Sequence, residues 1–145
     1  MGRNPTILVA EDDANDMTLL ALAFKKAGAF ATVHFVHNGL EATRYLQGKG
    51  PYQDRAQFPL PNLFVVDLKL PGMSGFELLA WVRGQPLLQQ MVMGVLSGSE
   101  YDQDIQKARA LGARFYLIKP QKPAELVVIA RQLVEECASG VPFVG

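Results

Sequence analysis

The sequence predicts an α/β fold built on a parallel sheet, and three observations support this. Five short apolar runs alternate with segments of helical periodicity, the pattern of parallel strands joined by crossover helices. The first run, from Ile7 to Ala10, lacks polar alternation, as expected of a strand covered on both faces. Polar side chains directly follow four of the runs, and in an open parallel sheet such strand ends meet at one edge, where ligands bind.

The first strand and helix are predicted from the start of the chain. Thr6–Ala10 forms the strand, and Gly28 ends the helix that follows it. Apolar residues at helical spacing should form the inner face of this helix: Met17, Leu20, Ala21 and Phe24.

The second strand and helix come next, and a long connection follows them. We expect the strand at Thr32–Val36. Asn38, with Glu41 three positions later, has the capping-box pattern that starts a helix, here running to about Gln47. Residues 48–61 contain three prolines and mixed polar residues, which indicates a surface loop longer than most αβ connections. A tolerated insertion is the favoured interpretation of this loop, and a specificity element is the alternative.

The second half of the chain should supply three more strand and helix pairs. They are strand 63–66, helix 74–83, strand 92–96, helix 101–111, strand 115–118 and a helix that starts at Pro123. We expect the third helix to bury Phe76, Leu79 and Val82, and the fourth to be weakly anchored by Ile105 and Ala108. The last helix has the strongest amphipathic pattern, in Leu126, Ile129, Ala130, Leu133, Val134 and Cys137.

Length and composition indicate one intracellular domain. The 145 residues suit a single domain, predicted at 6–138 with a short tail at 139–145. Because 14 Lys and Arg residues balance 14 Asp and Glu residues, no overall field favours nucleic acid or an anionic membrane. Cys137 is the only cysteine, which excludes an internal disulfide and suits a reducing compartment. There is no apolar stretch of about 18 residues, so we expect a cytoplasmic protein without membrane contact.

The polar clusters at the strand ends carry the chemistry. The first is Glu11-Asp12-Asp13, and the others begin with Asp67, Ser97 and Lys119. Two carboxylates 4 Å apart repel by about 4 kcal/mol at an effective dielectric near 20, and a bound cation would remove that cost. A carboxylate can also attack phosphorus and form an acyl phosphate. The edge of the sheet is therefore predicted to hold a divalent metal and to accept a phosphoryl group.

Four motifs in order resemble the receiver domain of two-component response regulators. They are Ile7-Leu8-Val9-Ala10-Glu11-Asp12-Asp13, Val66-Asp67-Leu68-Lys69-Leu70-Pro71-Gly72-Met73-Ser74-Gly75, Val95-Leu96-Ser97-Gly98-Ser99 and Tyr116-Leu117-Ile118-Lys119-Pro120. Any one motif would be weak evidence, but all four on the expected elements are a specific signal. The resemblance implies a doubly wound (βα)5 sheet with flavodoxin-like strand order 2-1-3-4-5.

The resemblance assigns a role to the residues around the acceptor. Asp67 matches the phosphoacceptor, Asp12 the direct ligand of Mg²⁺, and Glu11 the acid that usually reaches the ion through water. Mg²⁺ prefers oxygen ligands and keeps several waters, and the resemblance places a backbone carbonyl ligand at Lys69. Asp13 is expected to cap the first helix or to face solvent.

The other two strand ends are expected to sense the phosphoryl group. Lys119 matches the lysine whose ammonium pairs with phosphoryl oxygens, and Ser97 matches the hydroxyl that hydrogen-bonds them. Tyr116 matches the aromatic switch residue that swings inward; a surface aromatic with a solvated hydroxyl is the alternative. The family typically has a cis peptide between Lys119 and Pro120, so the same is expected here.

The implied function is signalling. The chain would take a phosphoryl group from a sensor histidine kinase or a phosphotransfer protein and signal by conformational change to a protein partner. It would not be a metabolic enzyme, since phosphotransfer and autodephosphorylation occur on the chain itself. The face of the fourth helix, fifth strand and fifth helix, where Val127 and Val128 lie beside the core stripe, is the candidate surface for output and for a homodimer. No DNA binding is expected.

Some positions depart from the common family pattern. Glu11 stands where Asp is commoner, Gly98 offers no side chain to screen the site, and Gln121 replaces a more usual apolar residue. The long loop at 48–61 and the absence of an output domain resemble stand-alone receivers paired with phytochrome-type sensor kinases.

The same residues allow three other interpretations. A degenerate receiver that binds partners without phosphorylation usually lacks the acceptor, the acidic pair or the lysine. A flavodoxin-like cofactor binder needs a phosphate loop after the first strand, where this chain has three acids. An aspartyl-nucleophile phosphatase typically has a second Asp two residues after the first, where this chain has Lys69.

Overall fold

A single parallel sheet of five strands forms the centre of the molecule. The computed structural model describes residues 4–28 and 30–139 of the chain. The strands are β1 Thr6–Ala10, β2 Thr32–Val36, β3 Leu63–Val66, β4 Val92–Ser97 and β5 Phe115–Ile118. All neighbouring pairs are parallel and the order is β2-β1-β3-β4-β5, which confirms the predicted doubly wound sheet.

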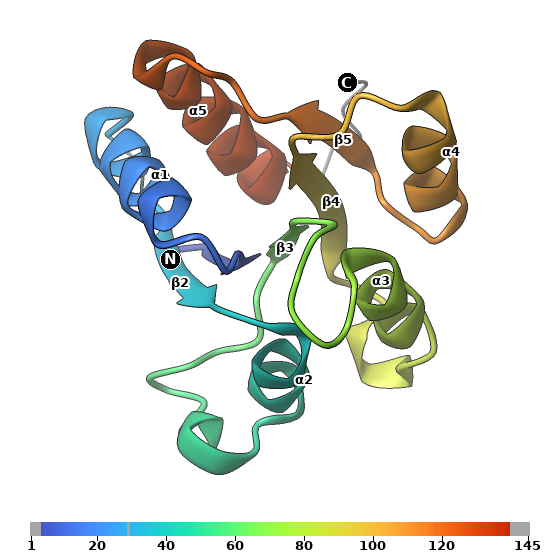
Figure 1. Cartoon of the computed structure of the whole chain (residues 1–145). Helices are drawn as coiled ribbons and strands as arrows, with labels where there is room; N and C mark the ends of the chain where they lie inside the picture. Colours follow the sequence, from blue (N-terminus) through green and yellow to red (C-terminus); the bar gives the residue numbers. More distant parts are fainter. Residues whose placement is uncertain (1–3, 29, 140–145) are drawn as a thin grey trace.

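Helices cover both faces of the sheet. They are α1 Ala14–Lys26, α2 Gly39–Gln47, α3 Gly75–Arg83, α4 Asp102–Ala110 and α5 Pro123–Ser139, with short 3-10 turns η1 Gly50–Tyr52 and η2 Pro86–Leu88. Figure 1 shows α1 and α5 on one face and α2, α3 and α4 on the other. The described residues therefore form two cores, one on each side of the sheet.

Alternate side chains of each strand enter opposite cores. In β1, Ile7 belongs to the core under α1 and α5, whereas Leu8 belongs to the core under the other three helices. Both are fully buried, which explains why the strand has no polar alternation.

Two predictions for the helices need correction. In α1 the buried residues are Leu20, Ala23 and Phe24, so Ala23 takes the inner place that the spacing gave to Ala21, which is exposed. In α3, Leu79 and Val82 are buried as predicted, but Phe76 is only half-buried, and the ammonium of Lys107 lies over its ring. The wide inner face of a helix on a sheet covers more positions than a single stripe indicates.

The long connection at 48–61 is packed against the body of the protein. Tyr52 and Phe58 lie with their rings 5.1 Å apart, and both contact the ring of Tyr45 in α2. The guanidinium of Arg55 donates to the carbonyl oxygens of Tyr45, Leu46 and Phe58. Because the carbonyls of Tyr45 and Leu46 lie in the last turn of α2, the loop caps that helix.

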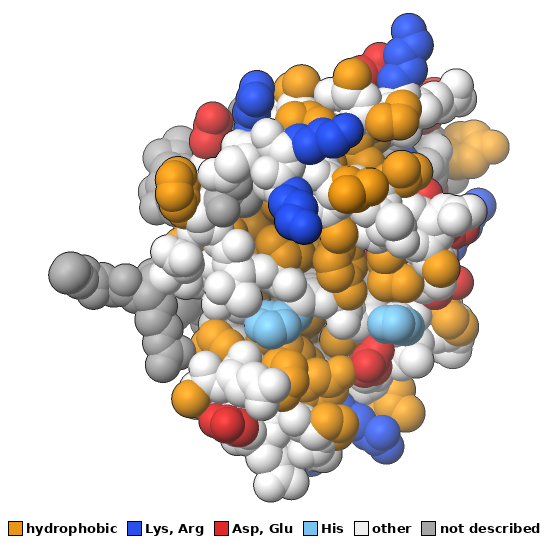
Figure 2. All heavy atoms as spheres, turned by 90° about the vertical axis from the view of Figure 1, so that its left-hand side faces the viewer, with side chains coloured by type: hydrophobic (Ala, Val, Ile, Leu, Met, Phe, Trp, Pro, Cys, Tyr) orange, Lys and Arg blue, Asp and Glu red, His pale blue; other side chains and the backbone are white. Residues whose placement is uncertain are grey.

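The outer side of α1 and the edge strand β2 form an apolar surface. Leu22 is 47% exposed, and with Val33 and Phe35 it lines a shallow hollow between the two elements. Figure 2 looks at this side of the molecule and shows apolar side chains at the surface.

None of the helices formed by residues 4–28 and 30–139 is long and apolar enough to cross a bilayer. Of the predicted tail at 139–145, Ser139 ends α5 and the rest lies outside the described residues.

Candidate functional site

Strand register brings three carboxylates together at one edge of the sheet. Ala10, the last residue of β1, pairs with Val66, the last residue of β3, so the residues that follow them are neighbours. These are Glu11, Asp12 and Asp67, and one carboxylate oxygen from each lies within 4.8 Å of the other two. Glu11 and Asp67 are buried, whereas Asp12 is exposed.

The backbone fixes the acidic residues. The N–H of Asp67 donates to the carbonyl of Ala10 at 3.1 Å, and the N–H of Glu11 donates to Val36 at 2.9 Å. Behind Asp67, α3 begins with Gly75, where a Cβ atom would lie 2.4 Å from the carbonyl oxygen of Asp67. Only glycine permits this approach, so the motif positions the loop that carries the carboxylate.

The caps of the helices around the site follow from short polar residues. Asp13 accepts a hydrogen bond from the N–H of Asp16 and caps α1, as one of the two predictions for Asp13 proposed. Ser74 and Glu77 form a complete capping box at the start of α3, which the sequence interpretation overlooked although the Ser-x-x-Glu pattern was present.

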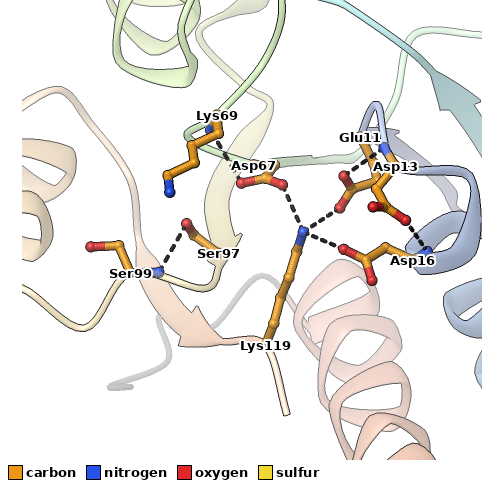
Figure 3. A network of polar contacts seen from close by, with 8 residues as sticks. All are labelled: Glu11, Asp13, Asp16, Asp67, Lys69, Ser97, Ser99 and Lys119. Carbon is orange, nitrogen blue, oxygen red and sulfur yellow. Dashed lines mark hydrogen bonds and ion pairs between the residues drawn. The ribbon is translucent and has the colours of Figure 1, made fainter. Parts of the chain in front are cut away.

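Lys119 extends from the end of β5 into the acidic group. Its Nζ lies 2.6 Å from Glu11 Oε1, 2.7 Å from Asp67 Oδ2 and 2.8 Å from Asp16 Oδ2. Figure 3 shows the ammonium between the three carboxylates. Asp16 was not among the predicted site residues, because an acid in the first turn of a helix is already explained by the helix dipole.

Burial and the neighbouring charges shift the pKa values of Glu11 and Lys119. Burial raises the pKa of Glu11 from 4.5 to about 7, and the nearby charge of Asp67 adds to the rise while the hydrogen bond from Lys119 opposes it. The pKa of Lys119 is also raised: burial opposes its charge, but hydrogen bonds to Asp16, Asp67 and Glu11 outweigh that effect. Lys119 is therefore a cation at neutral pH, and burial keeps the pKa of Glu11 above its ordinary value.

Ser97 and Tyr116 lie beside this group on the α4 side. Ser97, at the end of β4, is 1% exposed, and its hydroxyl accepts a weak hydrogen bond from the N–H of Ser99 at 3.4 Å. Tyr116 is buried in the core, and its hydroxyl donates to the carbonyl of Ser99 at 2.8 Å. The alternative of a surface aromatic with a solvated hydroxyl is therefore wrong for this structure.

The remaining predicted positions have mixed outcomes. The N–H of Lys69 donates to Asp67 Oδ1 at 3.2 Å, and its carbonyl as a metal ligand stays a prediction. The prediction of a cis peptide before Pro120 is wrong. Every peptide bond among residues 4–28 and 30–139 is trans, which is the form that X–Pro bonds favour. Gly98 is exposed, with no atom within 4 Å of the position of a Cβ.

The three carboxylates fit a divalent cation. Carboxylate oxygens are the ligands that Mg²⁺ and Mn²⁺ prefer, and three of them converge here. In this structure the ammonium of Lys119 neutralises part of the negative charge of Glu11 and Asp67.

Comparison with known proteins identifies the family. The family model described as the response regulator receiver domain matches residues 7–131, which includes every residue of the site. The chain belongs to this family. The receiver domain is a signalling module, and membership implies a histidine kinase and a downstream target as its partners.

Solved structures of similar receivers share the whole fold. The response regulator RPA3017 from red light signalling of R. palustris is 31% identical with a TM-score of 0.87, covering 94% of this chain and 96% of that one. The phosphorylated cyanobacterial phytochrome response regulator RcpA is 29% identical with a TM-score of 0.84, covering 95% and 96%. The receiver is thus similar to stand-alone, phytochrome-associated response regulators.

A third relative bears on the metal. Response regulator Rcp1 of Synechocystis sp. is 31% identical over 120 residues, which span 83% of this chain and 80% of Rcp1. The Mn²⁺-bound form of Rcp1 has a TM-score of 0.81 at 28% identity, covering 94% of this chain and 96% of that chain. A divalent cation at the acidic group is consistent with that relative.

Proposed function

We propose that Asp67 takes a phosphoryl group from the phosphohistidine of a sensor kinase or a phosphotransfer protein, in a Mg²⁺-dependent reaction. The observation that carries this proposal is the contact of 2.7 Å between Lys119 Nζ and Asp67 Oδ2, at the edge where Glu11 and Asp12 also converge. Such a group places a nucleophilic carboxylate beside a fixed cation, which is what transfer of a dianionic phosphoryl group requires.

The transfer needs only the two proteins and a proton from solvent. An oxygen of Asp67 attacks phosphorus, the P–N bond to the imidazole breaks, and the nitrogen keeps the electron pair and takes a proton from solvent. Lys119 pairs with the phosphoryl oxygens, and Ser97 donates its hydroxyl to one of them. Glu11, Asp12, Asp67 and the carbonyl of Lys69 would hold Mg²⁺, which neutralises charge on the phosphoryl oxygens.

The reaction ends on the protein itself. Attack of water on phosphorus breaks the bond to the Asp67 oxygen, releases inorganic phosphate and restores the carboxylate, so the domain passes through a self-catalysed cycle. It is a signalling switch and not a metabolic enzyme. We place it in the cytoplasm, in accordance with its single cysteine.

Intact mass spectrometry tests the acceptor. We expect incubation with a small phosphodonor and Mg²⁺ to add one labile phosphoryl group to the wild-type chain and none to Asp67→Asn. Excess chelator should prevent the addition. Labelling that persists in Asp67→Asn or in chelator would contradict the proposal.

We further propose that output is contact with protein, and not with DNA, through α4, β5 and α5, and that the same face is the candidate homodimer surface. Val128 is 52% exposed on this face, beside a hollow that also involves Ile118 and Ile129. Val127 instead packs against the core under α5, so its substitution would disturb the fold as well as the surface.

The apolar surface at α1 and β2 provides a matched control. We expect Val128→Glu to abolish dimerisation or partner binding, and Leu22→Glu, on the other surface, to leave it unchanged. Light scattering of the protein with a phosphoryl mimic measures the first effect. A monomer under all conditions, with partner affinity unaltered by Val128→Glu, would rule out this face.

A further inference from the structure

Asp16 makes a contact that its position in α1 does not explain. It lies three residues after the N-cap Asp13, where an acidic side chain commonly reaches back to the N-cap backbone. Here that N–H donates to Glu11 Oε2 instead. The side chain of Asp16 points across to the end of β5, where its Oδ2 lies 2.8 Å from Lys119 Nζ (Figure 3).

The ammonium of Lys119 has three N–H donors, and the structure provides three carboxylates for them. Two of these, Glu11 and Asp67, also belong to the group that could hold a cation. Asp16 does not belong to that group. A bound cation draws on the same oxygens as the ammonium, so Asp16 is the partner that remains for Lys119 when metal enters.

Burial separates the three carboxylates in the same way. The side chains of Glu11 and Asp67 are 6% and 9% exposed, whereas that of Asp16 is 42% exposed. Asp16 therefore lies at the mouth of the site and can follow the ammonium without leaving a buried charge unpaired.

We propose that Asp16 is a positioning residue for Lys119. It holds the ammonium at the mouth of the site while Glu11 and Asp67 exchange it for the metal ion, and so keeps the other N–H groups directed at the phosphoryl group on Asp67. The inference rests on the proposed phosphotransfer and adds to it a residue that touches neither metal nor phosphoryl group. Without Asp16, Lys119 has only metal-binding carboxylates as partners and competes with the ion.

The experiment compares Asp16→Asn with Asp13→Asn. Asp13 is an exposed carboxylate close to the same group, and Asn is as good an N-cap as Asp, so Asp13→Asn removes an equal charge and keeps the helix. The readouts are the side-chain ¹H–¹⁵N NMR signal of the Lys119 ammonium, with and without Mg²⁺, and a Mg²⁺ titration followed by backbone amides.

We expect the Lys119 signal to persist with Mg²⁺ in the wild type and in Asp13→Asn, and to vanish by fast exchange in Asp16→Asn. Mg²⁺ affinity should fall about three- to fivefold in Asp16→Asn, the scale of one partly exposed ion pair. It should fall less in Asp13→Asn. Equal losses in the two variants, or an unchanged Lys119 signal in Asp16→Asn, would overturn the inference.

Failure of the inference can be told from failure of the proposed function. Both readouts are taken without a phosphodonor. A wild-type chain that accepts no phosphoryl group refutes the proposed function, and the NMR signal still decides whether Asp16 positions Lys119. A chain that is phosphorylated normally, with an unchanged Lys119 signal in Asp16→Asn, refutes the role of Asp16 alone.

Discussion

The hydroxyl of Tyr116 donates a hydrogen bond of 2.8 Å to the carbonyl oxygen of Ser99, which joins the centre of β5 to the loop that follows β4. Ser97, two residues earlier, is the last residue of β4, and the loop leads into α4. Ser99 also donates its hydroxyl to Asp104 in α4 at 2.5 Å. A chain of contacts therefore connects the phosphoacceptor edge of the sheet to that helix.

The first prediction concerns this connection. Ser97→Ala removes the hydroxyl expected to bind the phosphoryl group, and Tyr116→Phe removes the bond to Ser99 while keeping the ring. Both variants should still be phosphorylated but should respond less to it, because the shift of α4 is limited by the differential interaction of the phosphoryl group with the two states. Amide shifts in α4 with a phosphoryl mimic measure the response. A wild-type response in Ser97→Ala would exclude this route.

The second prediction separates the two neighbouring acids. Both oxygens of Glu11 are engaged, one by Lys119 and the other by the N–H of Asp13. Within the described part of the chain the Asp12 carboxylate has no such partner and is exposed. Asp12→Ala should therefore weaken Mg²⁺ binding by about tenfold or more, and Glu11→Ala by less. Calorimetric titration measures both, and equal affinities would contradict the assignment of Asp12 as the direct ligand.

The third prediction is a pH dependence caused by Glu11. Its pKa is raised to about 7 in the folded protein, from 4.5, so between these values the folded state binds a proton that the unfolded chain has lost. The free energy of unfolding without metal should then decrease as pH rises through this range, by at most about 1.4 kcal/mol per unit. Urea unfolding in chelator measures the slope. Glu11→Gln, which cannot titrate, should flatten it; an equally steep slope in this variant would assign the effect to other groups.

The fourth prediction concerns the connection at 48–61. Arg55→Ala removes three hydrogen bonds to carbonyl oxygens and should lower the free energy of unfolding by about 1–3 kcal/mol, since no other side chain in the described part of the protein donates to these carbonyls. Lys49→Ala, an exposed change in the same segment, should have little effect. Phosphorylation of Asp67 should be the same in both. A neutral Arg55→Ala would show that the loop is held by its aromatic contacts alone.

Most of the fold could be predicted because the strands are continuous apolar runs. Thr6–Ala10 and Leu63–Val66 are buried on both faces, and their bounds agree with the sequence interpretation. The packing of the long connection could not be predicted, because it depends on Tyr52, Phe58 and Arg55 meeting Tyr45 from another element. A loop that is polar in composition and contains prolines gives no signal for such contacts.

The site shows the same division. Glu11, Asp67 and Lys119 could be predicted together because each directly follows a buried strand, and register fixes the strand ends relative to one another. Asp16 could not, since its partner Lys119 is 103 positions away and its place in the first turn of α1 already has a local explanation. A contact between a helix and a distant strand end appears only in three dimensions.

Helices α2 and α4 cover the same face of the sheet, but α2 is packed much more firmly than α4. The aromatic cluster and Arg55 clamp α2, whereas among the residues of α4 only Ala108 is fully enclosed. This face therefore has a firmly packed helix, α2, at one end and a loosely packed helix, α4, at the other, and Asp67 lies between them. If Asp67 is phosphorylated as proposed, we expect the weakly packed α4 to move more readily than α2, so the packing of this face would set the direction of the signal before any phosphoryl group arrives.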